Sequence, residues 1–153
     1  MLRPDATLSA HTSSEEIAAL LEQLRSPGQG GELSEKMGIE FTELGHDHIV
    51  ATAPVDGNRQ PMGLFHGGAH VVLAESLASM HSFLISGGKN VVGVDLNATH
   101  LRAARDGIVA GRAEVLHQGR RIVSHEVKMT DEAGRLLSIV RITNMILGTE
   151  PKS

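Results

Sequence analysis

The sequence of 153 residues contains no cysteine, no tryptophan and no tyrosine, and only three phenylalanines. Without cysteine the chain forms no disulfide and no thiolate metal site, which is compatible with a reducing compartment. With so few aromatic rings, the core must be aliphatic, and an aromatic ligand would meet few stacking partners. We therefore expect a cytoplasmic protein built on an aliphatic core.

A strong charge of either sign is also absent. The formal net charge is −4, from 14 Lys and Arg against 18 Asp and Glu, which gives no reason to expect nucleic acid or an anionic membrane as a partner. The first residues show no basic region followed by an apolar run, so a secretory signal is not expected. The length suits one domain with a full core.

Apolar periodicity and turn residues predict two strands, one long helix and then four strands. Ser13 and Glu16 have capping-box spacing and predict a short helix within a peripheral N-terminal extension, residues 1–31. The main domain is predicted over 32–148, beginning with a short helical turn at 34–37, and a tail covers 149–153. The predicted strands are 39–41, 49–55, 92–98, 109–115, 123–129 and 136–147.

Residues 67–85 have the length and composition of a core helix that is apolar on nearly every side. Between Arg59 and Lys89 the only formally charged residue is Glu75. Burying a carboxylate is costly unless it is paired, hydrogen-bonded or protonated. Glu75 is therefore the best candidate for a functional group. The alternative is a structural carboxylate, satisfied by a buried histidine or by backbone amides.

A helix with apolar residues on nearly every side must pack against other elements on every side. An α+β fold, with a curved antiparallel sheet wrapped around one long central helix, supplies most of that cover. A second subunit is the simplest source of the rest. We therefore expect a dimer.

Several motifs are spread over roughly residues 33–147. They are Gln60 with Gly63–Ala69 and Leu73–Ser76, then Val92–Arg102, His117–Arg120 and Asp131–Arg135. Together they resemble the signature of hotdog-fold acyl-CoA thioesterases of the PaaI-like type. The branch is that of the Arthrobacter-type 4-hydroxybenzoyl-CoA and the 1,4-dihydroxy-2-naphthoyl-CoA thioesterases. The resemblance implies hydrolysis of an acyl-CoA, favouring an aromatic acyl group, without a cofactor. It also implies a homodimer, assembled further into a homotetramer.

The resemblance assigns roles to five residues. It implies that Glu75 is the nucleophile or general base and that the Gly67 amide polarises the thioester carbonyl. It also implies that Gln60 and His66 orient or polarise the thioester, while Ser79 positions the water. From the residues alone, His66 could instead cap the helix, Gln60 could be an ordinary loop amide, and Ser79 could simply pack.

Further residues are candidates for binding the substrate or coenzyme A. Coenzyme A carries phosphates, which need cationic or amide donors at the mouth of a site. The candidates are Gly68, Asn97, His100, Arg102, Arg120 and Arg121. For each arginine, an ordinary solvated side chain is the alternative. His46 and His48 are spaced as two ligands on a strand would be, but no third ligand is indicated, so no metal site is predicted.

Gly67 and Glu75 are eight residues apart, which is about 12 Å along a helix. One thioester carbon cannot easily contact both ends of that span. Two antiparallel helices would place Gly67 of one subunit opposite Glu75 of the other. Two other functions stay open, namely a hydratase or dehydratase of acyl thioesters and a non-catalytic acyl-CoA-binding dimer. The sequence also leaves open whether the acyl group is carried by coenzyme A or by a carrier protein. It leaves open as well whether Glu75 itself or a water molecule attacks the thioester.

Overall fold

The computed structural model describes residues 6–148, so the predicted tail at 149–153 and the first five residues of the N-terminal extension lie outside the described residues. The elements are α1 (Ser14–Arg25), α2 (Gly31–Met37), β1 (Glu40–Leu44), β2 (His48–Pro54), α3 (Gly67–Ile85), β3 (Val91–His100), β4 (Ile108–Gln118), β5 (Ile122–Thr130) and β6 (Leu136–Ile146).

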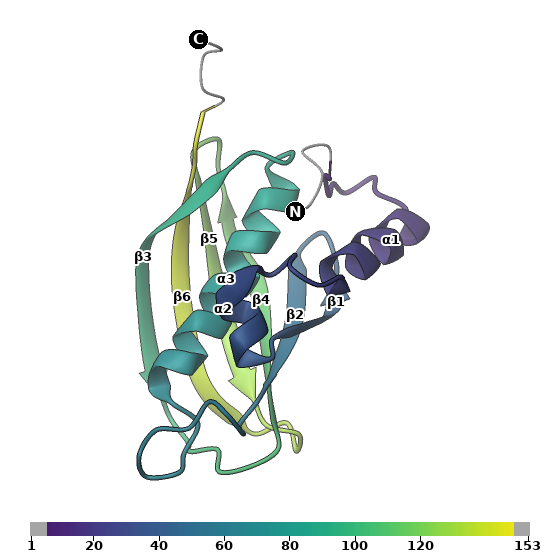
Figure 1. The fold of residues 1–153 in the computed structure, drawn as a ribbon. Coiled ribbons are helices and arrows are strands. Elements are labelled where there is room, and N and C mark those ends of the chain that lie inside the picture. The colour runs from purple at the N-terminus through teal and green to yellow at the C-terminus, as the bar shows by residue number, and fades with distance from the viewer. Residues whose placement is uncertain (1–5, 149–153) are drawn as a thin grey trace.

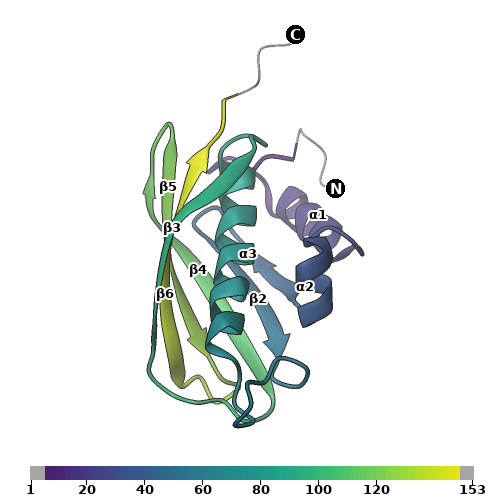
Figure 2. The same ribbon diagram turned by 60° about the vertical axis from the view of Figure 1, so that its left-hand side comes forward.

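The six strands form one antiparallel sheet in the order β1-β2-β4-β5-β6-β3. The sheet curves around α3, while α1 and α2 lie at the β1 side (Figures 1 and 2). The predicted α+β architecture is confirmed, with every strand in the expected order. The predicted helical turn at 34–37 is longer than expected, because α2 already begins at Gly31.

The helix α1 begins as its capping box predicts. Ser13 is the N-cap, and the Glu16 carboxylate accepts the Ser13 N–H at 2.7 Å. Leu24 is buried, and the Arg25 Nε donates to the Phe41 carbonyl at 2.9 Å. These contacts attach the C-terminal end of α1 to β1.

The central helix packs tightly on the sheet. Leu73 and Leu77 of α3 are fully buried, and they face Gly111 of β4. A Cβ at Gly111 would lie 2.8 Å from Leu77 Cδ1 and 2.9 Å from Met129 Sδ. The glycine therefore lets the helix approach the sheet more closely than any side chain would allow.

The opposite face of α3 is open in the single chain. The helix is long and apolar enough for a membrane span by length and composition, yet 56% of its apolar window is buried inside the fold, so it is the core helix. Glu75, however, is exposed. One chain therefore does not cover the helix on all sides, because the sheet wraps one side and α2 covers only part of the other.

Within residues 6–148, the strand β3 forms one edge of the sheet and pairs only with β6. Two of its apolar side chains, Val92 and Val94, are 44% and 50% exposed. An edge strand with exposed valines is a ready partner for another chain.

Candidate active site

The loop before α3 is fixed at several points, so the N-terminal end of the helix is held in place. The His66 N–H donates to the Asn58 carbonyl at 2.9 Å, and the Phe65 N–H donates to the Ala104 carbonyl at 2.8 Å. The Asn58 side chain in turn donates to the Met37 carbonyl at 2.8 Å.

His66 is the N-cap of α3. Its Nδ1 accepts the Gly68 N–H at 2.8 Å, so the capping role weighed from the sequence is the one seen in the single chain. Because a cap needs the lone pair on Nδ1, the neutral ring carries its proton on Nε2. His66 is exposed, so this second nitrogen remains available as a donor to a substrate.

Gly67 is the first residue of α3, and its N–H therefore has no acceptor within the helix. The helix dipole adds partial positive charge at the same point. A Cβ at Gly67 would lie 2.9 Å from His100 Nε2, so the His100 ring covers this position closely. The amide at Gly67 is thus suited to an oxygen that gains negative charge.

The orientation of His100 is set by Ser138 on β6. His100 Nδ1 lies 3.0 Å from Ser138 Oγ, and that hydroxyl donates to the Thr99 carbonyl at 3.1 Å. Since the hydroxyl has one proton, it accepts from His100 Nδ1–H. In the neutral ring this leaves the lone pair of Nε2 directed toward Gly67.

A second histidine, His70, is in the first turn of α3 and is buried. Burial lowers the pKa of His70 to about 4, and the charge of His100 adds to the effect. Its ring packs edge-on against Phe65, with centroids 4.7 Å apart, and lies 5.2 Å from His100. His70 is therefore neutral at pH 7, and its buried Nδ1 has no hydrogen-bond partner among the described residues.

These residues border a cavity of about 310 Å³ at the N-terminal end of α3. Four of the predicted site residues line it: Gln60, Gly67, His100 and Arg102. Gln60 Oε1 accepts the Met62 N–H at 2.6 Å, which leaves the side-chain NH₂ as its donor end. The cavity therefore combines amide donors with one cationic side chain.

Glu75 lies farther along α3, beside β3. A Cβ at Gly93 would lie 2.7 Å from Glu75 Oε1, so the glycine leaves room for the carboxylate against the strand. Ser79 follows one turn later, and its Oγ donates to Asn144 Oδ1 at 3.2 Å. Asn144 is fully buried and also donates to Ser82 Oγ at 3.1 Å. The hydrogen bond to Asn144 of β6 thus fixes the position of the Ser79 hydroxyl.

Ser79 lines a different and larger cavity, of about 530 Å³, between residues 28–31 and the C-terminal half of α3. Glu75 lines neither this cavity nor the one at Gly67. The single chain therefore brings Gln60, Gly67, His100 and Arg102 together, but it leaves Glu75 and Ser79 at a separate place on the helix.

Three predicted binding residues lie away from the Gly67 cavity. Asn97 is an exposed residue of β3 that pairs in register with Arg141. Arg120 and Arg121 are in the turn between β4 and β5. That turn lies near the C-terminal end of α3, where Gln118 Nε2 donates to the Ile85 carbonyl at 3.0 Å.

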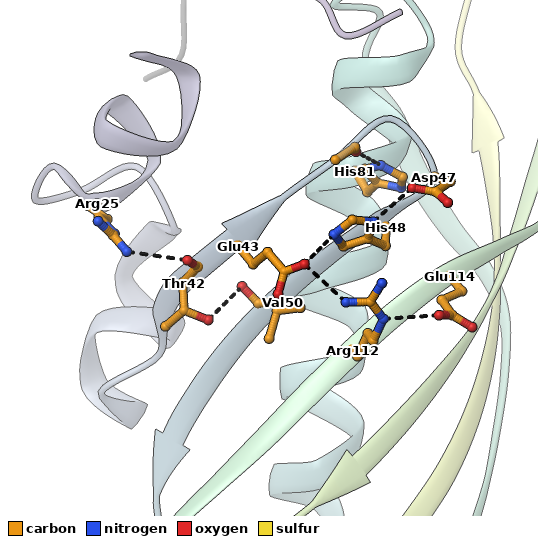
Figure 3. Close-up of polar contacts among 10 residues, drawn as sticks. Arg25, Thr42, Glu43, Asp47, His48, Val50, His81, Arg112 and Glu114 are labelled. Carbon is orange, nitrogen blue, oxygen red and sulfur yellow. Dashed lines mark hydrogen bonds and ion pairs between the residues drawn. The ribbon is translucent and has the colours of Figure 1, made fainter. Parts of the chain in front are cut away.

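His48 belongs to a polar cluster across β1, β2 and β4 (Figure 3). Its Nε2 lies 2.6 Å from Glu43 Oε1, and its Nδ1 lies 2.8 Å from Asp47 Oδ1. Arg112 also contacts Glu43 at 3.2 Å. Burial alone would raise the pKa of Glu43, but its bonds to His48 and Arg112 lower it overall. Within residues 6–148, no group of three or more His, Asp or Glu side chains could hold a metal ion.

Sequence reasoning missed Gly93, Ser138 and Asn144, which position the predicted residues. Two of them carry a signal that could have been used. Gly93 interrupts a strand, which is typical of a close approach by another group, and Asn144 is a polar residue in an otherwise apolar strand. Ser138 gives no such signal, because its contact with His100 depends on the register of β3 against β6.

Comparison with known proteins identifies the family of the chain. The family model of the thioesterase superfamily matches residues 62–138. The chain is 43% identical to the 1,4-dihydroxy-2-naphthoyl-CoA hydrolase of Escherichia coli strain K12, across 83% of this chain and 94% of that protein. It is also 43% identical to the proofreading thioesterase EntH of Cronobacter turicensis, across 77% and 88%.

Solved structures agree with the sequence comparisons. A thioesterase from Haemophilus influenzae superposes with a TM-score of 0.80 at 37% identity, covering 86% of this chain and 92% of that chain. The chain therefore belongs to the thioesterase superfamily and is a thioester hydrolase with the hotdog fold.

Proposed function

We propose that the protein hydrolyses an aromatic acyl-CoA to the carboxylic acid and coenzyme A, without a cofactor. The observation that carries the proposal is the presence, on one helix, of an N-terminal amide at Gly67 that has no acceptor within the helix and of an exposed carboxylate at Glu75. The relative named as a 1,4-dihydroxy-2-naphthoyl-CoA hydrolase supports an aromatic acyl group. The cysteine-free composition is consistent with the cytoplasm as the place of action.

In this proposal the thioester carbonyl binds at the start of α3. The Gly67 N–H and the helix dipole stabilise the negative charge that develops on the oxygen. The Nε2–H of His66 and the NH₂ of Gln60 are further donors for the thioester. Glu75 then attacks the carbonyl carbon or takes a proton from a water that attacks it, and Ser79 positions that water. When water attacks, the carbon–sulfur bond breaks and the proton that Glu75 took from the water passes to the leaving thiolate of coenzyme A. When Glu75 attacks, cleavage of the carbon–sulfur bond leaves an anhydride between the acyl group and Glu75; a water then hydrolyses it, which releases the acid, restores the carboxylate and supplies the proton for the thiolate.

The site needs a second copy of the chain. Gly67 and Glu75 are about 12 Å apart along the helix, so we propose antiparallel α3 helices that place each Glu75 opposite the other copy's Gly67. The exposed valines of the β3 edge support such a pairing. Antiparallel helices also bring Arg120 and Arg121 of one copy toward the Gly67 cavity of the other, where coenzyme A phosphates need cations. The family resemblance further favours a homotetramer of two such dimers.

The test is a hydrolysis panel of benzoyl-, phenylacetyl- and fatty acyl-CoA with the wild-type protein and Glu75→Gln. We expect the aryl substrates to give the highest kcat/KM and Glu75→Gln to lower kcat by at least about 100-fold. Glu15→Gln is the matched control, because Glu15 is an exposed carboxylate of α1, and it should retain full activity.

Two results would overturn the proposal. One is binding of acyl-CoA with only a background rate of hydrolysis, which Glu75→Gln leaves unchanged; this would indicate a binding protein. The other is hydration of crotonyl-CoA without hydrolysis of any thioester, which would indicate a hydratase.

A further inference from the structure

Three polar side chains form a hydrogen-bonded row between α3 and β6. The Ser79 Oγ donates to Asn144 Oδ1 at 3.2 Å, and Asn144 Nδ2 donates to the Ser82 Oγ at 3.1 Å. Asn144 and Ser82 are fully buried, whereas Ser79 is half-buried and lines a cavity. The row therefore begins inside the core and ends at a hydroxyl that a water can reach.

The middle residue of the row, Asn144, is held on both sides by the sheet. The strand β6 lies between β5 and β3 (Figure 1), and Asn144 pairs with Val123 of β5 and with Gly93 of β3. The hydrogen bond to Ser82 then fixes which end of the amide faces Ser79. The Asn144 side chain is thus oriented before any substrate binds.

The row ends beside the proposed catalytic carboxylate. A Cβ at Gly93 would lie 2.7 Å from Glu75 Oε1 and 3.7 Å from Asn144 Oδ1, so both oxygens lie next to the same glycine. Ser79 is four residues after Glu75 and therefore shares its face of α3. A water between Glu75 and Ser79 is thus within the influence of Asn144.

The direction of the hydrogen bond between Ser79 and Asn144 determines what Ser79 offers to such a water. An amide oxygen carries no proton and can only accept, so the single proton of the Ser79 hydroxyl is directed at Asn144. The Ser79 oxygen keeps its lone pairs for other partners. A water beside Ser79 is therefore bound as a donor.

A water that donates to both Ser79 and Glu75 uses both of its hydrogens. Its own lone pairs are then directed away from these two acceptors, which is the orientation needed for attack on the thioester carbon. One proton passes to Glu75 as the new carbon–oxygen bond forms, and the other stays on the attacking oxygen. No proton passes to Ser79 or Asn144.

We infer that Asn144 is a positioning residue, which accepts the hydrogen bond of the Ser79 hydroxyl and so leaves the Ser79 oxygen to accept one from the attacking water. The inference rests on the proposed function and extends it to a buried residue of β6. Without the Asn144 amide, the Ser79 hydroxyl can rotate and direct its proton at a carbonyl of α3 or at the water itself. The water is then less often oriented for attack.

A double-mutant cycle tests the inference. Asn144→Leu replaces the amide by an apolar group of similar size, and Ser79→Ala removes the hydroxyl. The values of kcat and KM are measured for the wild-type protein, both single variants and the double variant, with the acyl-CoA that the wild-type protein hydrolyses best. Thr143→Val is the matched control, because Thr143 precedes Asn144 in β6 and its hydroxyl contacts Ser124 on the other face of the sheet.

We expect Asn144→Leu to lower kcat about tenfold and to leave KM within about twofold, while Thr143→Val changes neither. In the Ser79→Ala background, Asn144→Leu should change kcat by less than about twofold, because no hydroxyl is left to orient. An equal fold-loss in both backgrounds would overturn the inference, since it would show that Asn144 acts through packing. Wild-type kcat in Asn144→Leu or in Ser79→Ala would overturn it as well.

Ser82→Ala carries the same test if Asn144→Leu does not fold. It removes the acceptor that anchors Asn144 Nδ2 but leaves the amide in place. We expect kcat to fall about threefold in the wild-type background and to stay unchanged in the Ser79→Ala background. Equal effects in the two backgrounds would again overturn the inference. Failure of the wild-type protein to hydrolyse any acyl-CoA, or wild-type kcat in Glu75→Gln, would instead contradict the proposed function.

Discussion

The backbone of β3 lies directly beside the Glu75 carboxylate, at Gly93. The space there is too small for a methyl group, since a Cβ would lie 2.7 Å from Glu75 Oε1. We therefore expect Gly93→Ala to displace the carboxylate and to lower kcat roughly 10- to 100-fold, because small misplacements of a catalytic group are costly.

Steady-state kinetics and far-UV circular dichroism together check this prediction for Gly93. The dichroism should be unchanged, because alanine is no worse than glycine in a strand. Gly148→Ala is the control, since a Cβ there meets nothing within 4 Å. Wild-type kcat in Gly93→Ala would show that Glu75 has room to adjust or does not take part.

Individual residues were predictable where they contrast with their neighbours along the chain. Glu75 is conspicuous among apolar residues, and Gly67 and His66 stand at the start of a helix, so one stretch of sequence identifies all three. Ser138 could not be found in this way. Its contact with His100 depends on the register of β3 against β6, and no local pattern encodes that register.

At the level of elements, α3 packs tightly against β4 at Gly111. Gly111→Ala should destabilise the protein by about 1–2 kcal/mol, because the added methyl group would press on Leu77 and Met129 in a fully packed core. Urea unfolding measures the free energy, with Gly148→Ala again as the control. A gain in stability would show that both side chains shift easily and that the backbone entropy of glycine dominates.

The elements themselves follow local rules and were largely predictable. The bounds of α3 agree with its apolar run, and each hairpin turn coincides with a Gly-containing cluster such as 117–120 or 131–134. The start of α2 and the contact of Leu24 with the core were not predictable. They arise from the path of the chain between α1 and β1, which short-range propensities leave undetermined.

For the whole molecule, the proposed dimer makes a prediction about mixed subunits. Glu75→Ala and His66→Ala chains are each inactive in their own dimers, but a hybrid dimer contains one site with both side chains intact. After random exchange, half of the dimers are hybrids, so about a quarter of wild-type activity should return. Activity that stays at the level of the separate variants would show that each site lies within one chain.

Buried histidines predict how stability depends on pH. His81 and His125 are fully buried, with His81 Nδ1 2.9 Å from His125 Nε2, and His81 Nε2 donates to the Gly45 carbonyl at 3.0 Å. Burial lowers the pKa of His81 to about 4 and that of His125 to about 3. Both rings are therefore neutral in the native state at pH 7.

Because these folded-state pKa values lie below the value of 6.5 for free histidine, the unfolded chain binds more protons between pH 6.5 and 4. Stability is therefore fully present above pH 6.5 and is lost as the pH falls toward 4, by roughly 3 kcal/mol for one such histidine. Urea unfolding at pH 7.5, 6.5, 5.5 and 4.5 checks this. A free energy of unfolding that stays constant over that range would contradict it.

The sheet order also determines when the fold can form. In sequence β6 follows every other described strand, yet in space it lies between β5 and β3. During synthesis, β3 has no partner strand until β6 has left the ribosome, and translation adds only about 5–20 residues per second. For a few seconds the apolar face of α3 is therefore incompletely covered. The nascent chain is then exposed to aggregation, and chaperone binding would protect it in that interval.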